Sequence, residues 1–155
     1  MNENPFEITE DVTIQGSSTV DGVSPVFKPG TDGNFGNYGV FEATGTLDVT
    51  LREIGFDGVY HYGNAAGFYG PNADVTLDSI NSFNLKGIYG LVESNNITVT
   101  STGEFQSYFG NTFGSSVFSG GALNAIGNVT VTDRVEIEVV SDGPSVEGVT
   151  LVNES

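Results

Sequence analysis

The stretch Asn-Ile-Thr-Val-Thr at residues 96–100 decides the fold, because a closely related phrase occurs five times along the chain. The other copies are Asp-Val-Thr-Ile at 11–14, Asp-Val-Thr-Leu at 48–51 and again at 74–77, and Asn-Val-Thr-Val at 128–131. In each copy, Asp or Asn and Thr alternate with two aliphatic residues, so the apolar pair faces one side of a strand and the polar pair the other. Each copy therefore predicts a short β-strand with one buried face.

The intervals between the copies indicate a solenoid. The copies begin at residues 11, 48, 74, 96 and 128, so they are 37, 26, 22 and 32 residues apart. These intervals scatter around the length of one coil of a repeat protein. Further strand-like stretches follow some copies, at 82–85, 103–105, 58–62 and 87–92. We therefore expect about five coils with three short strands in each.

The remaining composition agrees with an all-β fold. The 22 glycines lie at the predicted strand ends, where tight corners need their conformational freedom. No stretch of a dozen residues has the apolar spacing of a helix. Loops inserted at 25–38 and 108–121 account for the longer intervals, and such insertions often gather on the binding face of a solenoid. One domain over 1–155 is predicted, with 1–5 as a polar tail.

A known family resembles this pattern. Three short strands per coil, the phrase Asn-Val-Thr-Val-Thr at 128–132 and Phe-Ser-Gly-Gly-Ala-Leu-Asn-Ala at 118–125 resemble the right-handed parallel β-helix of pectate-lyase-like proteins. The Gly-Gly-Ala-Leu element is similar to a repeat of polymorphic outer-membrane proteins and autotransporter adhesins. It occurs once here, and their Phe-x-x-Asn motif has only a near match at 108–111. The resemblance implies a right-handed parallel β-helix. The structural alternative is an antiparallel β-sandwich, favoured by the alternation at 133–140.

Net charge limits the partners of the chain. Four basic residues oppose 20 acidic ones, for a formal charge of −16 at pH 7. Such a chain repels the phosphates of nucleic acids and of anionic membranes. Its apolar runs are far shorter than the roughly 20 residues that span a bilayer. We expect no nucleic-acid partner and no membrane insertion by this segment.

Cofactor chemistry finds little support in the residues present. The chain has no cysteine, which excludes disulfides, thiolate catalysis and cysteine-held metals. Its many carboxylates could bind Ca²⁺. However, neither the spacing of an EF-hand loop nor the glycine-rich nonapeptide of calcium-binding β-rolls occurs. We predict that the protein uses no cofactor.

Catalysis is an alternative because β-helix proteins include polysaccharide lyases and hydrolases. Glycosidases need two positioned carboxylates, and the polygalacturonase-like signatures Asn-Thr-Asp, Asp-Asp and Gly-His-Gly are absent. Arg52 and Glu53 lie beside Asp48 and Asp57 in the one mixed-charge cluster, which we interpret as a solvated ion pair. We predict that the chain is not an enzyme.

A binding surface is predicted where aromatic residues gather, at 56–69 and 105–118. Most of these side chains should fill the coils. Strand alternation does not allow all those near position 60 to point inward. Exposed aromatic rings beside Asn and Asp suit a sugar or a protein partner. The candidate binding residues are Tyr60, His61, Tyr62, Phe68 and Tyr69.

The outward threonines of the five copies suggest a further alternative. A regular threonine array on a solenoid resembles ice-binding surfaces. The charged residues Arg52 and Asp78 in the neighbouring column and the uneven intervals count against it. The array consists of Thr13, Thr50, Thr76, Thr98 and Thr130, doubled by Thr100 and Thr132 in the last two copies.

The two ends of the chain complete the expectations. No basic segment followed by an apolar stretch comes after Met1, so we expect a mature or excised segment of an extracellular or cell-surface protein. The strand expected at 148–152 has no evident cap. Val149 and Leu151 are therefore predicted to mediate stacking. Taken together, the sequence predicts a non-catalytic structural or adhesive solenoid that associates end to end or binds a cell-surface protein or glycan.

Overall fold

The computed structural model describes ten segments of the chain, which contain strands and turns and no helix. They are residues 5–16, 25–27, 39–57, 59–61, 65–87, 91–100, 104–109, 123–132, 135–141 and 149–151. The all-β prediction is confirmed for them. Within these segments, no helix has the length and apolar character needed to cross a membrane. The loops expected at 25–38 and 108–121 lie almost wholly outside the described residues.

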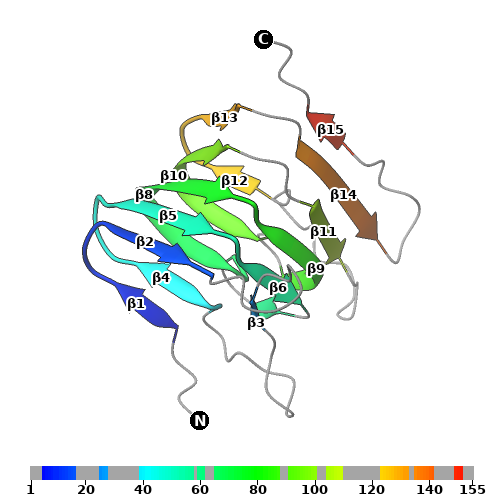
Figure 1. The fold of residues 1–155 in the computed structure, drawn as a ribbon, viewed down its shortest axis with the longest axis horizontal. Coiled ribbons are helices and arrows are strands. Elements are labelled where there is room, and N and C mark those ends of the chain that lie inside the picture. Colours follow the sequence, from blue (N-terminus) through cyan, green and yellow to red (C-terminus); the bar gives the residue numbers. More distant parts are fainter. Residues whose placement is uncertain are drawn as a thin grey trace.

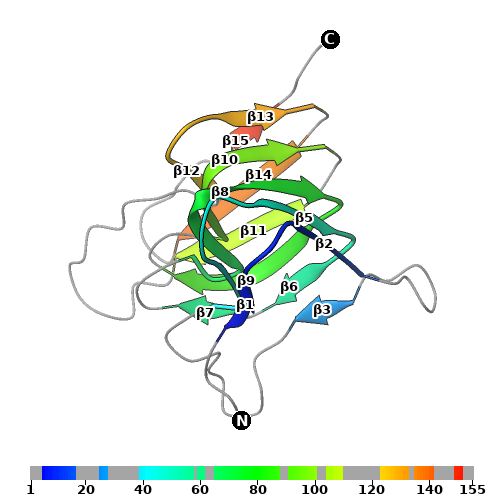
Figure 2. The same ribbon diagram turned by 90° about the vertical axis from the view of Figure 1, so that its left-hand side faces the viewer.

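The described strands form two main sheets that curl into a half-barrel (Figure 1). The first sheet contains β1 (Phe6–Ile8), β2 (Val12–Gln15), β4 (Phe41–Ala43), β5 (Asp48–Arg52), β8 (Phe68–Asp78), β10 (Val92–Val99), β12 (Leu123–Ala125) and β13 (Val129–Val131). The second contains β3 (Val26–Phe27), β6 (Gly55–Asp57), β9 (Asn81–Gly87), β11 (Glu104–Phe109), β14 (Val135–Ser141) and β15 (Val149–Leu151), with β7 (Tyr60–His61) beside β9. In Figure 2 the early strands lie at one end of the stack and β13 at the other.

The five copies of the phrase lie on one another in parallel and in register. We call the strands they form the repeat strands: β2, β5, residues 74–78 of β8, residues 96–99 of β10, and β13. Each pairs with the next, so that equivalent residues are direct partners. The alignment deduced from the sequence is therefore the alignment of the sheet.

A second set of parallel strands precedes the repeat strands. It consists of β1, β4, the first part of β8, the first part of β10, and β12. Its apolar partners run in the order Phe6, Phe41, Phe68, Val92 and Leu123. A register shift between Ser94 and Asn96 separates the two parts of β10.

The second sheet is parallel except at one edge. Strands β3, β6, β9, β11 and β14 pair in parallel. The last strand, β15, pairs antiparallel with β14 through Val149 opposite Ile137. The alternation at 133–140 that favoured a sandwich thus belongs to a strand with one parallel and one antiparallel neighbour. Mostly parallel pairing is consistent with a β-solenoid-like fold.

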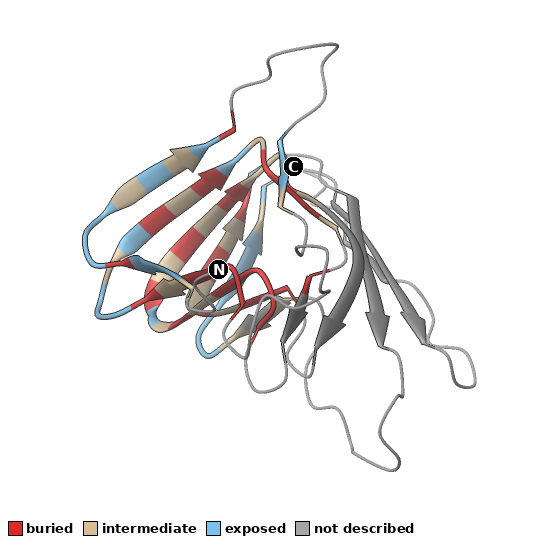
Figure 3. Cartoon of the chain, turned by 90° about the horizontal axis from the view of Figure 1, so that it is seen from below, coloured by how far each residue is buried: buried red, intermediate tan, exposed pale blue. Residues whose placement is uncertain are grey.

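The core fills the space between the sheets. Inward side chains of the middle repeat strands are buried, as Figure 3 shows by the alternating red bands. In the first sheet these are Val49, Leu51, Val75, Leu77, Ile97 and Val99. Burying each such side chain stabilises the fold by about 1.5–3 kcal/mol. Aromatic rings close one side of the core, where Phe27 stacks on Phe56 with ring centroids 5.8 Å apart.

Candidate interaction surfaces

The N-terminal end of the core is open. Val12 and Ile14 of β2 are only partly buried, whereas their partners Val49 and Leu51 are fully buried. The reason is that β2 pairs with β5 alone among the described strands. Phe6 of β1, at the outer edge of the same sheet, is 61% exposed. The outermost layer of core side chains at the N-terminal end therefore faces solvent.

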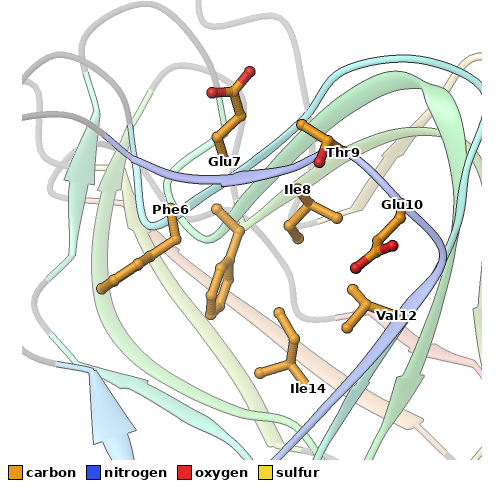
Figure 4. Close-up of a pocket in the computed structure, with 8 residues that line it drawn as sticks. Phe6, Glu7, Ile8, Thr9, Glu10, Val12 and Ile14 are labelled. Atoms are coloured by element: carbon orange, nitrogen blue, oxygen red, sulfur yellow. The ribbon is translucent and has the colours of Figure 1, made fainter.

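A hollow of about 300 Å³ lies at this open end. It is lined by Phe6, Glu7, Ile8, Thr9, Glu10, Val12, Ile14 and Phe41. Figure 4 shows Ile8, Val12 and Ile14 around a common space, with Glu10 beside them and Glu7 directed away. The hollow therefore has an apolar floor and an acidic border.

Phe6 is held in place despite its exposure. Its ring centroid lies 5.9 Å from that of Phe41 and 6.4 Å from that of Phe27. The Phe6 ring thus packs against the aromatic side of the core, while much of the side chain stays exposed to solvent. An exposed but positioned aromatic side chain is a typical anchor for a protein partner.

The opposite end of the first sheet is open too. Val129 of β13 is 44% exposed, and Ile126 in the turn before it is 67% exposed. Val129 and Val131 occupy the same inward columns as Val12 and Ile14. No charged residue occurs in 123–132. Within 123–132 this end is uncharged, in contrast to the acidic N-terminal end.

A polar ladder joins the repeat strands along their outer side. The backbone N–H of Asp48 donates to Asp11 Oδ1 at 2.9 Å, and that of Asn128 donates to Asn96 Oδ1 at 3.0 Å. Asn96 Nδ2 donates to Asp74 Oδ1 at 2.8 Å. At two of the steps, then, the later copy donates a backbone N–H to the side-chain oxygen of the earlier one. The ladder gives the stack a chemical direction.

Glycine is required where the ladder meets the last copy. A Cβ on Gly127 would lie 2.5 Å from Asn96 Oδ1 and 3.1 Å from the backbone oxygen of Asn95. Neither atom belongs to the end of a long flexible side chain. The absence of a side chain at this position therefore lets Asn96 reach the N–H of Asn128.

The charged cluster differs from the sequence interpretation. The sequence interpretation placed Arg52 in a solvated ion pair beside Glu53, Asp48 and Asp57. Arg52 Nε instead lies 2.6 Å from Asp78 Oδ2 of the following repeat strand. The two residues are direct register partners. Likewise, Gln15 Nε2 donates to Glu53 Oε2 at 3.2 Å. Side-chain pairing runs between successive copies, because neighbouring strands bring equivalent positions close together.

The predicted aromatic site is not one surface. Phe68 is completely buried and belongs to the core, so it cannot line an exposed platform. Tyr69 follows on the outward side and is partly buried. Tyr60 and His61 form β7, which pairs with β9 of the second sheet and not with the first sheet that contains Tyr69. Tyr62 lies outside the described residues.

Carboxylates flank Tyr69 on both neighbouring strands. Its register partners are Glu42 of β4 and Glu93 of β10. Burial raises the pKa of the Glu93 carboxyl. An aromatic ring between two hydrogen-bond acceptors suits the apolar face and the hydroxyls of a sugar. Among the described residues, no group of three His, Cys, Asp or Glu side chains is placed to hold a metal ion.

The threonine array exists as an in-register column. Thr13, Thr50, Thr76, Thr98 and Thr130 are register partners across five parallel strands. Strand spacing places successive members about 4.8 Å apart. Arg52, Asp78 and Asp48 lie in the adjoining outward positions, so the charged part of this face covers its N-terminal half.

The predicted stacking residues lie on the edge strand of the second sheet. Val149 and Leu151 belong to β15, opposite Ile137 and Val135 of β14. Their part in association stays a prediction. Sequence reasoning missed the open residues of the first sheet at both ends. The signal available for them was their place in the first and last copies of the phrase, since a terminal copy lacks one neighbour.

Comparison of the chain with known protein families, curated proteins and solved structures gives no match. The functional interpretation therefore depends on the geometry of these surfaces.

Proposed function

We propose that the chain is a non-catalytic structural or adhesive element that acts outside the cell or at the cell surface. We infer a right-handed parallel β-helix of about five coils with three short strands each. The observation that carries the proposal is the contrast along the inward columns: they are closed in the middle repeat strands and open at both ends. A solenoid of this kind gains stability when another polypeptide covers its ends.

Two physical terms favour coverage of the ends. Phe6, Val12 and Ile14 would leave water, at about 25 cal/mol for each Å² of apolar surface buried. The outer backbone groups of β1 and β2 would gain hydrogen-bond partners, as edge strands do when another strand is added. The function is then mechanical: the chain transmits and extends a parallel stack, or presents its outer faces to a cell-surface protein or glycan.

The test is a concentration series of the purified chain, studied by sedimentation velocity and negative-stain electron microscopy, with and without Ca²⁺. We expect species that grow in length with protein concentration and do not depend on Ca²⁺. The same samples are incubated with anionic polysaccharides, whose chain length should not change. Cleavage of a polysaccharide by the purified chain would contradict the proposal and establish the enzyme alternative.

Carbohydrate binding is the second candidate, favoured by the position of Tyr69 between Glu42 and Glu93. A glycan screen with the native chain and with Tyr69→Ala tests it. Retention of a glycan by the native chain and loss of retention in the variant would support this role. Thr76→Ala, on the same strand and also facing outward, is the matched control.

Ice binding is a minor candidate, favoured by the in-register threonine column. It predicts that the chain lowers the freezing point of water more than its melting point. Thr98→Glu should abolish that difference, because a charge would interrupt the column at its uncharged half. Native samples that freeze and melt at the same temperature, as buffer without protein does, would exclude this role.

A further inference from the structure

We propose that the partner of the open N-terminal end is a second copy of this chain, stacked head to tail through the first sheet. Residues 11–15 of one copy pair in parallel with residues 128–132 of the next. In this register Val129 lies over Val12, Thr130 over Thr13 and Val131 over Ile14. The inference rests on the proposed structural role and names its partner and its geometry.

The two end strands already fit the pairing rule of the molecule. Inside one chain, every step between repeat strands places Val, Ile or Leu on Val, Ile or Leu, and Thr on Thr. The first and last repeat strands, β2 and β13, carry the same pattern. Joining them repeats an existing step, so the junction needs no new kind of contact.

The exposed inward residues at the two ends belong to the same columns. Val12 and Ile14 are partly open at one end, and Val129 is 44% exposed at the other. Their columns are continuous through the molecule, with Val75 and Leu77 fully buried in the middle. A head-to-tail contact would bury both open layers against each other and extend the core from copy to copy.

The polar ladder gives the junction a direction. In the step from β2 to β5, the N–H of Asp48 donates to Asp11 Oδ1, and in the step from β10 to β13 the N–H of Asn128 donates to Asn96 Oδ1. At the proposed junction the N–H of Asp11 would donate to Asn128 Oδ1 of the preceding copy. Donor and acceptor are thus already present on opposite ends.

Charge also favours head-to-tail over head-to-head contact. The N-terminal end carries Glu7, Glu10 and Asp11, whereas residues 123–132 carry no charge. Two N-terminal ends brought together would oppose acidic residues in an apolar contact, which is costly. The neutral end accepts the acidic end without such opposition. A contact between two different surfaces that does not close on itself produces a filament.

The junction uses the first sheet because the second sheet ends differently. Its outer strand at the C-terminal side is β15, which pairs antiparallel with β14. This closes the parallel series of the second sheet. In the first sheet the series still ends in the parallel strand β13.

Cysteine cross-linking tests the register, because the chain has no cysteine of its own. Thr13→Cys and Thr130→Cys are made as separate variants, and circular dichroism checks that each retains the native β-structure. Both positions are exposed. Facing residues on adjacent strands lie within the roughly 4.4–6.8 Å between Cα atoms that a disulfide spans. The variants are oxidised alone and as a mixture, then separated on non-reducing gels.

We expect a covalent dimer in the mixture and only background dimer in either variant alone. A double variant carrying both substitutions should give a ladder of covalent oligomers. A mixture of Thr50→Cys and Thr98→Cys is the matched control, because these positions lie in inner repeat strands. Dimers of Thr13→Cys alone, as abundant as in the mixture, would overturn the direction.

Three further outcomes separate the inference from the function it rests on. Native chain that assembles without cross-linking above the control overturns the junction but leaves a structural role. Chain that stays monomeric at every concentration and leaves polysaccharides intact overturns the junction and leaves an adhesive role. Monomeric chain that cleaves a polysaccharide overturns both.

The amide of Asn128 provides a second measurement. Asn128→Ala removes the proposed acceptor, so association should weaken by roughly fivefold, as for one hydrogen bond. Asn128→Asp keeps an acceptor but adds a charge opposite Asp11, so association should weaken further and recover partly at high salt. Light scattering reports both effects. Equal association of native chain and Asn128→Asp at low salt would contradict the inference.

Discussion

The middle and the ends of the stack contain similar apolar residues at equivalent positions, yet these residues differ in burial. Phe68 is completely buried between Phe41 and Val92, whereas Phe6, in the same column, is 61% exposed. The difference arises because a side chain inside a parallel stack of strands is covered by the copies on both sides of it. A terminal copy keeps one neighbour. In this molecule, therefore, similar side chains at equivalent positions contribute differently to stability, depending on whether one or two neighbouring copies cover them.

The largest expected effect is the difference in stability between variants of Phe68 and of Phe6. Phe68→Ala should lower the free energy of unfolding by about 3–5 kcal/mol, because it leaves a cavity in the covered core. Phe6→Ala should cost clearly less, since most of its ring is already in water. Urea denaturation of both variants, at a concentration where the chain is monomeric, measures the difference. Equal losses would show that the N-terminal end is covered.

The next effect concerns Ser94, which carries a buried hydroxyl in a middle strand. Ser94 Oγ lies 2.7 Å from the backbone oxygen of Ala73 and 2.8 Å from that of Asn96, so it can donate its proton to either. Ser94→Ala should cost about 1 kcal/mol of stability. Thr98→Ala, on the outer side of the same strand, should cost less. Denaturation midpoints that rank the two variants the other way would contradict this assignment.

A smaller effect is expected from the ion pair between Arg52 and Asp78. The Arg52 side chain is 44% exposed and that of Asp78 is 23% exposed. Solvent screens such a pair, so its net contribution is about 0–1 kcal/mol. A double-mutant cycle with Arg52→Ala and Asp78→Ala measures it, and 0.5 M NaCl should reduce the coupling. A coupling that does not respond to salt would mean that the pair is shielded from solvent.

The smallest effect depends on pH. Burial raises the pKa of Glu93 in the folded chain above its ordinary value of 4.5. The folded chain therefore holds this proton more tightly than the unfolded chain, and ionised Glu93 lowers stability at neutral pH. This loss of stability disappears as the pH falls through the raised pKa of Glu93 towards 4.5.

Glu93→Gln removes this penalty, so its Tm should exceed that of the native chain slightly at pH 7. The gain should vanish below about pH 4.5, where the native carboxyl is protonated in both states. Glu7→Gln, at an exposed position in the equivalent column, controls for the loss of one negative charge. A gain for Glu93→Gln that persisted unchanged into acid would assign the effect to packing rather than ionisation.

The periodic part of the fold could be predicted from sequence, because the phrase around Thr13, Thr50 and the later threonines repeats both its polarity and its side-chain shape. The column of Phe41 and Phe68 was not identified as a strand series. Its members change from Phe to Val and Leu, and their polar neighbours differ between copies. The first set of strands becomes visible only when the repeat strands fix its register.

Side-chain contacts between the repeat strands were harder to predict than the strands themselves. The partner of Arg52 is 26 residues away, and local charge alone pointed to nearer acids. The direction of β15 also escaped prediction, because alternation of polar and apolar residues is the same in parallel and antiparallel strands. The buried position of Phe68 follows from alternation only once the inward side of its strand is known.

The central claim is that the two ends of the first sheet are open in one chain and cover each other when chains associate. Amide hydrogen exchange, followed by mass spectrometry from dilute to concentrated chain, tests it most directly. We expect residues 74–78 to be protected at every concentration, and residues 11–15 and 128–132 to gain protection together as the chain associates. Association without added protection at these two end segments, or full protection of both in dilute monomer, would contradict the account.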